Sequence, residues 1–276
     1  MPGASDDLAA PRRTLLDALG ALDSQLDALV LIGAQAIYIW TAEARVALAA
    51  TTNDSDLAVD RRLLADEPRL EEAMTQAGFH LDPRSPQPGA WVSPSGVPVD
   101  LMLPDTQSGA GGRRGARIPP HSSTAVRRTA GLEAAVVDHR PVLIRSLDPE
   151  DEREYEIKVA SPAALLVAKL HKLGERQASP DRLLDKDAHD IYRLLVAVPT
   201  GELAEGLIRL QADPLAGEVT GVALRFLEQL FADGPDALGC MMAGRAEALV
   251  GEPDVVAVAA ATLATDLLQA LNREQR

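Results

Sequence analysis

Two segments decide the fold, Leu31-Ile32-Gly33-Ala34-Gln35-Ala36 and, about twenty residues later, Thr51-Thr52-Asn53-Asp54-Ser55-Asp56-Leu57. The first is an apolar run that ends in glycine and continues as a helical pattern. The second places two aspartates at alternate positions where an alternating strand begins. Since successive strand side chains point to opposite faces, Asp54 and Asp56 project the same way at roughly 6–7 Å between Cα atoms. Two carboxylates this close repel each other unless a cation lies between them.

Such a pair suits Mg²⁺, which binds a few carboxylate oxygens together with waters and substrate phosphates at about 2.1 Å. A third acid is expected in Gly96-Val97-Pro98-Val99-Asp100-Leu101-Met102-Leu103, a strand pattern with one carboxylate among apolar residues. A buried charge is costly on its own, so Asp100 needs a metal ion or a donor beside it. The order of these acids predicts a metal-dependent phosphoryl-transfer site for a nucleoside triphosphate. In a chain with 41 acidic residues, the alternative for Asp-x-Asp is a solvated strand end or a turn cap.

The N-terminal half resembles the polymerase-β-type nucleotidyltransferase core, in which an apolar strand and a small-residue turn precede an Asp-x-Asp and a third Asp. More narrowly, the chain resembles the AbiEii-like and MenT-like nucleotidyltransferase toxins. The narrower resemblance rests on two segments that are similar to the family's Lys-Leu and Lys-Asp-x-x-Asp helices. They are Ser161-Pro162-Ala163-Ala164-Leu165-Leu166-Val167-Ala168-Lys169-Leu170 and Asp185-Lys186-Asp187-Ala188-His189-Asp190-Ile191-Tyr192. The resemblance covers roughly residues 25–200.

The resemblance implies that Asp54 and Asp56 are the metal-binding pair and Asp100 the third carboxylate. In two-metal chemistry the acid beside the incoming hydroxyl can bind a metal and accept the hydroxyl proton, which is the role expected of Asp100. The resemblance also implies that Lys169 contacts the triphosphate and that Asp187 is the later acidic residue of the site. Without it, Lys169 would be interpreted as an ordinary lysine on an amphipathic helix.

Gly33 and Ala34 are expected at the phosphates. The related proteins usually have Gly or Ser at the position of Ala34, so only its backbone N–H could contribute. A Gly-rich stretch over residues 108–128 holds five arginines, of which Arg113 and Arg114 are expected at the phosphates because Arg recognises phosphate bidentately. The alternative for this stretch is a surface loop.

The 276 residues of the chain, 46% of them hydrophobic, suffice for one large or two smaller globular domains. The element pattern divides the chain near residue 160, and the resemblance implies an α+β fold, with a polymerase-β-type core and a mixed sheet over residues 1–160 followed by a helical bundle over 161–276. No secretory pattern or long uncharged apolar run is evident in the sequence, so a cytoplasmic protein without a membrane partner is expected. The single cysteine, Cys240, excludes an intramolecular disulfide and a Cys-rich zinc site.

The element pattern predicts strands at 29–32, 90–93, 97–103, 141–147 and 155–159, and a helix over 61–77 that ends at Gly78. Ser161 and Pro162 form an N-cap and N1 pair, and later helices are expected to begin near residues 180, 200, 215, 235 and 253.

The carboxylate pattern predicts a Mg²⁺-dependent enzyme that uses NTP. The resemblance implies a nucleotidyltransferase toxin that transfers a nucleotide to the 3′ end of tRNA, and it also implies a cognate antitoxin. The net charge of −14 argues against RNA, although the arginine-rich stretch with Lys158, Lys169 and Lys172 could form a local basic cleft. Two alternatives remain open at this point. One is the same chemistry on a small cationic acceptor such as an aminoglycoside, and the other is a non-catalytic nucleotide-binding protein.

Overall fold

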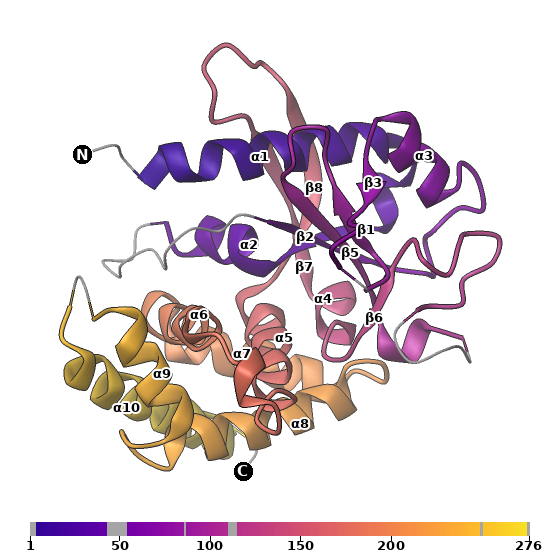
Figure 1. The fold of residues 1–276 in the computed structure, drawn as a ribbon. Helices are drawn as coiled ribbons and strands as arrows, with labels where there is room; N and C mark the ends of the chain where they lie inside the picture. The colour runs from indigo at the N-terminus through magenta and orange to yellow at the C-terminus, as the bar shows by residue number, and fades with distance from the viewer. Residues whose placement is uncertain (1–3, 43–53, 86, 110–114, 249–250, 275–276) are drawn as a thin grey trace. The chain divides into compact units, whose positions relative to one another are not determined.

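The computed structural model describes residues 4–42, 54–85, 87–109, 115–248 and 251–274 (Figure 1). The chain forms two compact units. The first comprises Met1–Gln35, Thr51–Leu132 and His139–Ala160, and the second comprises Ala36–Ala50, Glu133–Asp138 and Ser161–Arg276. Two short segments from the N-terminal half therefore group with the C-terminal helices, and a single domain boundary at residue 160 stays a prediction.

The first unit contains a mixed sheet. Its described strands are β1 (Leu29–Ile32), β2 (Ser55–Val59), β3 (His80–Leu81), β4 (Ala90–Val92), β5 (Pro98–Pro104), β6 (Arg127–Thr129), β7 (His139–Arg145) and β8 (Glu154–Ala160). The order is β3-β4-β5-β2-β1-β8-β7, and β6 pairs with β5. β2 runs parallel to β5, β1 to β8 and β5 to β6, while the other neighbours are antiparallel. Together with the helices at the C-terminus, this sheet confirms the predicted α+β class with a mixed sheet.

The core of the first unit forms between this sheet and the N-terminal helix. α1 (Ala4–Ala21) packs against β2, β5 and β8, and its Leu15, Leu16 and Leu19 are fully buried. β1 is buried along its whole length, as its uninterrupted apolar sequence predicts. It ends at Gly33, whose φ of 70° lies in the left-handed region that glycine adopts without strain. There the chain turns directly into α2 (Gly33–Trp40).

The predicted helix over 61–77 is wrong in its first half, because α3 spans only Leu70–Gln76. The Asp60 carboxylate accepts hydrogen bonds from the Arg62 backbone N–H at 3.0 Å and from its guanidinium at 2.7 Å, which fixes a turn. Pro68 then disfavours helical geometry at the residue before it, so the helix begins only after Pro68. The described part of this unit also contains two short 3₁₀ helices, η1 (Asp23–Ala28) and η2 (Asp105–Gln107).

The second unit is helical. Its described helices are α4 (Glu133–Val137), α5 (Pro162–Gly174), η3 (Pro180–Arg182), α6 (Asp185–Ala197), α7 (Thr200–Ala212), α8 (Gly217–Leu227), η4 (Glu228–Ala232), α9 (Leu238–Ala246) and α10 (Pro253–Glu274). α5 packs against α6, α7 and α8, and α10 packs against α7 and α9. The N-cap prediction at Ser161 is confirmed, since its hydroxyl accepts from the Ala164 N–H at 3.2 Å. Near residue 180 the chain forms only a 3₁₀ turn, and α6 begins at Asp185.

Among the helices that the structure describes, α10 is the one whose length and composition would allow it to cross a membrane. Its Ala260, Ala264 and Leu267 are fully buried, while Val255 and Val258 are exposed. The buried face belongs to the packing with α7 and α9, as in a core helix of a soluble protein. Length and composition alone therefore do not assign α10 to a membrane, and the cytoplasmic location stays a prediction.

Candidate active site

Two of the predicted carboxylates lie side by side in the first unit. β2 and β5 are parallel neighbours, and their register pairs Asp56 with Asp100. Residues directly paired on adjacent strands share a face, with strands about 4.8 Å apart. The preceding pair, Ser55 and Val99, lies on the opposite face and is fully buried. The sequence pattern that placed alternate residues on opposite faces is thus followed here, and both carboxylates are partly exposed.

Gly33 closes one side of this pair. A Cβ atom at Gly33 would overlap a carboxylate oxygen of Asp56 and would lie 2.8 Å from Asp56 Cγ and 2.9 Å from Asp56 Cβ. Glycine is therefore required at this position twice, for its positive φ and for the room that Asp56 needs. Ala34 follows as the second residue of α2 and is half-buried. The Asp56 side chain thus lies against the turn at the start of that helix.

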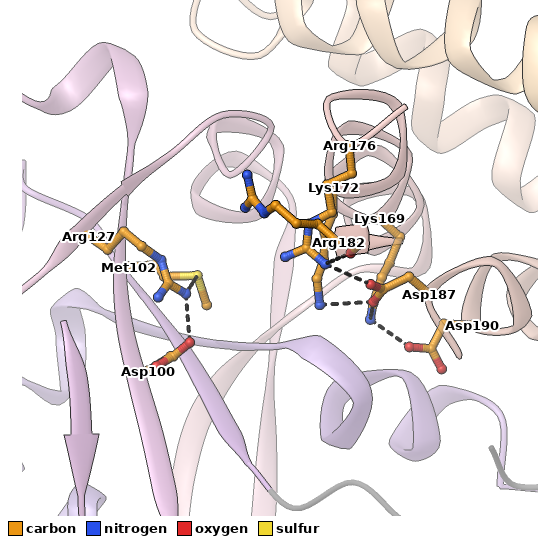
Figure 2. A network of polar contacts seen from close by, with 9 residues as sticks. All are labelled: Asp100, Met102, Arg127, Lys169, Lys172, Arg176, Arg182, Asp187 and Asp190. Atoms are coloured by element: carbon orange, nitrogen blue, oxygen red, sulfur yellow. Dashed lines mark hydrogen bonds and ion pairs between the residues drawn. The ribbon is translucent and has the colours of Figure 1, made fainter. Parts of the chain in front are cut away.

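Arg127 occupies the other side. It lies on β6, paired in register with Met102 of β5, and its Nη2 donates to Asp100 Oδ2 at 2.6 Å (Figure 2). The same guanidinium contacts Met102 Sδ at 3.3 Å and Gln87 Oε1 at 3.1 Å. The two charged side chains are 18% and 23% exposed. Asp100 was expected to need a metal ion or a donor beside it, and Arg127 is that donor, through a short charge-assisted hydrogen bond.

A buried network of hydrogen bonds fixes the start of β2 through Ser55, on the face of the sheet opposite Asp56. The Gln35 amide donates to Ser55 Oγ at 2.7 Å, and the Ser55 hydroxyl donates to the Pro11 carbonyl at 3.0 Å. Arg12 Nε donates to Gln35 Oε1 at 3.2 Å, and burial lowers the pKa of the Arg12 guanidinium. Buried polar groups that are mutually satisfied fix one arrangement of the backbone. The network therefore ties α1, α2 and the start of β2 together next to Asp56.

The remaining first-unit predictions have mixed outcomes. Asp54 lies one residue before β2, and its carbonyl is 3.5 Å from the Gln35 amide nitrogen. Within the described ranges, no group of three or more His, Cys, Asp and Glu side chains is placed to hold a metal ion. The three-carboxylate metal site therefore stays a prediction. Arg113 and Arg114 lie outside the described residues, and Arg128 pairs with Asp105 at 2.8 Å.

The second unit brings Lys169 and Asp187 together as an ion pair. Lys169 Nζ on α5 lies 2.6 Å from Asp190 Oδ2 and 3.1 Å from Asp187 Oδ1, both on α6 (Figure 2). The Lys169 side chain is 8% exposed, and the two carboxylates are 1% and 3% exposed. Asp187 and Asp190, three residues apart, share one helix face as their spacing predicts. This buried pair joins α5 to α6.

Two further cations contact the same carboxylate. Lys172 Nζ lies 2.9 Å from Asp187 Oδ1, and Arg176 Nη1 lies 3.3 Å from Asp187 Oδ2. Burial acts to raise the pKa of Asp187, but the charges and hydrogen bonds of Lys169 and Lys172 outweigh it and hold that pKa well below its usual range. Asp187 is therefore an ionised carboxylate inside a cationic cluster.

Sequence reasoning did not identify Arg127 as the partner of Asp100 or Arg176 as part of the cluster. The cluster had a readable signal, because Lys169, Lys172 and Arg176 follow helical spacing i, i+3 and i+7. The Arg127 contact had none, since it depends on the pairing of β6 with β5.

Comparisons with known proteins add little to this geometry. No family model matches the chain, and no curated protein matches it. One similar solved structure is described as "Crystal structure of putative nucleotidyltransferase from H. pylori". The similarity covers 97% of this chain and 98% of that chain, with 9% sequence identity and a TM-score of 0.36. At that TM-score the likeness supports no conclusion about this chain.

Proposed function

We propose that the protein is a Mg²⁺-dependent nucleotidyltransferase, a toxin of the AbiEii-like and MenT-like kind that transfers a nucleotide from NTP to the 3′ end of tRNA. One observation carries the enzymatic part of the proposal. Asp56 and Asp100 stand in register on parallel strands, and Asp56 lies against the Gly33 turn that begins α2. Paired carboxylates next to a small-residue turn are what a site for a metal-bound triphosphate requires.

The donor set fits Mg²⁺. This ion prefers carboxylate oxygens and keeps waters and phosphate oxygens for its other positions, so two or three aspartates are sufficient. Asp54, Asp56 and Asp100 would hold it, and when bound it would neutralise the charge of the phosphates. Asp100 would exchange its contact with Arg127 for the ion.

The reaction balances as a displacement at phosphorus. The acceptor hydroxyl oxygen forms a bond to the α-phosphorus of the NTP, the bond from that phosphorus to the bridging oxygen breaks, and pyrophosphate leaves. Asp100 accepts the hydroxyl proton. Arg127 donates to Asp100 in the structure, and its guanidinium would be able to contact a phosphate oxygen if that hydrogen bond were given up. Gln35 and Ser55 would act as positioning residues, because their hydrogen bonds hold the start of β2.

The net charge of −14 favours one other acceptor class. A strongly acidic protein attracts cations, so a small cationic acceptor such as an aminoglycoside fits the global charge better than tRNA does. The nucleotide chemistry would be the same. Salt separates the two acceptors, since transfer to RNA should weaken steeply as ionic strength rises, whereas a small acceptor should respond less.

A thermal-shift experiment tests the nucleotide site. We expect each NTP that binds to raise the melting temperature of the wild type only when Mg²⁺ is present. Asp56→Asn and Asp100→Asn should lose that shift, whereas Asp105→Asn, an exposed aspartate of the same unit, should keep it. An equal, Mg²⁺-independent shift in all four proteins would reject the catalytic proposal in favour of a nucleotide-binding protein without transferase activity.

A further inference from the structure

Arg61 and Arg117 lie next to each other in the first unit, beside Gly109. Arg61 follows the last residue of β2 by two positions, and Gly109 and Arg117 form an isolated antiparallel bridge in the segment after β5. A Cβ atom at Gly109 would lie 3.9 Å from Arg61 Nη1 and 3.6 Å from Arg117 Cβ. Both arginines are exposed. The fold thus brings two exposed arginines that are distant in sequence to one place.

Gln107 holds the Arg61 side chain in this position. Its Oε1 accepts a hydrogen bond from the Arg61 backbone N–H at 2.8 Å, and its carbonyl accepts one from Arg61 Nη1 at 3.1 Å. The Gln107 amide nitrogen in turn donates to Asp60 Oδ1 at 3.0 Å. An arginine whose guanidinium is already oriented loses less side-chain entropy when it binds a ligand. Arg61 is therefore pre-organised although it is exposed.

The charges of Arg61 and Arg117 differ in their surroundings from that of the adjacent Arg62. Arg62 Nη2 lies 2.7 Å from the Asp60 carboxylate. Within the part of the chain that the structure describes, neither Arg61 nor Arg117 forms an ion pair with an acid. Two like charges at close range repel each other, so an anion that contacts both is favourable. The pair is a local positive site in a chain whose net charge is −14.

We propose that Arg61 and Arg117 bind the phosphate backbone of the acceptor RNA. This inference rests on the proposed function for the choice of RNA. A guanidinium matches the geometry of a phosphate and can donate two hydrogen bonds to it. At an exposed place salt screens the attraction, so two arginines hold a single small anion weakly. An RNA contacts the protein through many phosphates and releases counterions at each, so an open pair of arginines contributes to its affinity.

The arginine pair is separate from the carboxylate pair of the same unit. Asp56 is the second residue of β2, and Arg61 follows the other end of that strand. At about 3.3 Å per residue, the strand extends about 10 Å beyond Asp56. An RNA whose 3′ hydroxyl lies at Asp100 would reach the arginines with nucleotides that precede its 3′ end. The two arginines are therefore assigned to RNA binding and not to the chemical step.

Fluorescence anisotropy with labelled tRNA, in the absence of NTP, tests the pair on the full-length protein. We expect Arg61→Gln and Arg117→Gln each to bind tRNA at least about fivefold more weakly than the wild type. Arg145→Gln is the matched control. It removes the same charge from β7, three strands away from β2 in the sheet, where Arg145 is 71% exposed and lies 3.0 Å from Glu154. This variant should bind like the wild type.

The salt dependence of binding distinguishes a phosphate contact from a structural effect. Loss of one phosphate contact reduces the slope of log K against log salt concentration by about 0.7–0.9. We expect at least that reduction in the double variant with Arg61→Gln and Arg117→Gln, and no change in Arg145→Gln. Arg117→Lys keeps the charge and should retain the wild-type slope. Circular dichroism of every variant establishes that it is folded.

Each other outcome would overturn the proposal. Absence of tRNA binding by the wild type would do so, as would an unchanged slope in the double variant or an equal loss of affinity in Arg145→Gln and Arg61→Gln. If Arg61→Gln and Arg117→Gln bind inorganic triphosphate more weakly and tRNA normally, the pair binds a small anion and the RNA assignment is wrong. Since the titration contains no NTP, a protein that binds tRNA through this pair and transfers no nucleotide would refute the proposed function alone.

Discussion

Replacing Gly33 with alanine tests the contact on which the candidate site depends, and the chain supplies a matched control at Gly96. Both glycines have positive φ, 70° at Gly33 and 84° at Gly96. A Cβ atom at Gly96 would meet nothing within 4 Å, whereas one at Gly33 would overlap the Asp56 carboxylate. The two substitutions thus share the backbone strain, and only Gly33→Ala adds the clash with Asp56.

The magnitudes follow from these two terms. A left-handed conformation costs a non-glycine residue roughly 1–2 kcal/mol, and the lower entropy of the unfolded chain offsets about 0.4–1 kcal/mol of it. Gly96→Ala should therefore lower the free energy of unfolding by about 1 kcal/mol or less. At Gly33 the added methyl group would also lie 2.9 Å from Asp56 Cβ, an atom that cannot rotate away. Overpacking of this kind costs about 1–3 kcal/mol more.

The functional consequence should exceed the change in stability. Relief of the clash moves the Asp56 carboxylate or the start of α2, and a displacement of about 1 Å at a reacting centre can lower a rate about 100-fold. Urea unfolding followed by circular dichroism gives the stability, and the Mg²⁺-dependent thermal shift with NTP gives the occupancy of the site. Equal stability and equal nucleotide shifts in Gly33→Ala and Gly96→Ala would refute the role of the Gly33 turn.

Three other predictions follow from the ion pairs. Lys169→Met should lower the free energy of unfolding by about 3–5 kcal/mol, because it leaves two buried carboxylates without their shared lysine; a loss under about 1 kcal/mol in urea unfolding would contradict this. Arg127→Gln should lower the Mg²⁺ concentration that half-saturates the nucleotide-induced thermal shift, because Arg127 and the ion compete for Asp100. Arg128→Gln should leave that concentration unchanged, and an equal effect of the two substitutions would contradict the competition. Since the pKa of Asp187 is depressed in the folded protein, its stabilising contribution should be complete above the pKa of an unfolded aspartate, about 3.9, and should fall as the pH drops below that value. Unfolding of wild type and Asp187→Asn across that range measures the difference, which should shrink as the pH falls; a constant difference would contradict the assignment.

Local sequence signals predicted those parts of the fold that short-range chemistry controls. The apolar run before Gly33 predicted a buried strand and Ser161 predicted the N-cap of α5, and the structure confirms both. The predicted helix over 61–77 was wrong in its first half because a turn at Asp60 and a proline at position 68 outweigh the helical periodicity of that segment. The periodicity of hydrophobic residues does not reveal such competing local hydrogen bonds.

The candidate site was predictable only where its residues lie in elements with clear patterns. The alternation in β2 and β5 placed Asp56 and Asp100 on strands, but their pairing in register depends on a parallel alignment of segments that are distant in sequence. The ion-pair partners of these side chains could not be predicted from the sequence either. Arg127 meets Asp100 through β6, and Lys169 meets Asp190 across two helices, so neither contact leaves a signal within one element. Lys169 lies in a buried ion pair with Asp187 and Asp190, and its contact with the triphosphate stays a prediction.

Nucleotide transfer to tRNA is tested most directly by incubating the purified protein with total tRNA, Mg²⁺ and each nucleoside triphosphate in turn, labelled at the α-phosphate, with Asp56→Ala alongside. We expect label to enter tRNA with the wild type and not with Asp56→Ala, and the labelled nucleotide would identify the substrate. If no label enters tRNA with any nucleotide while circular dichroism shows a folded protein, transfer to tRNA is contradicted.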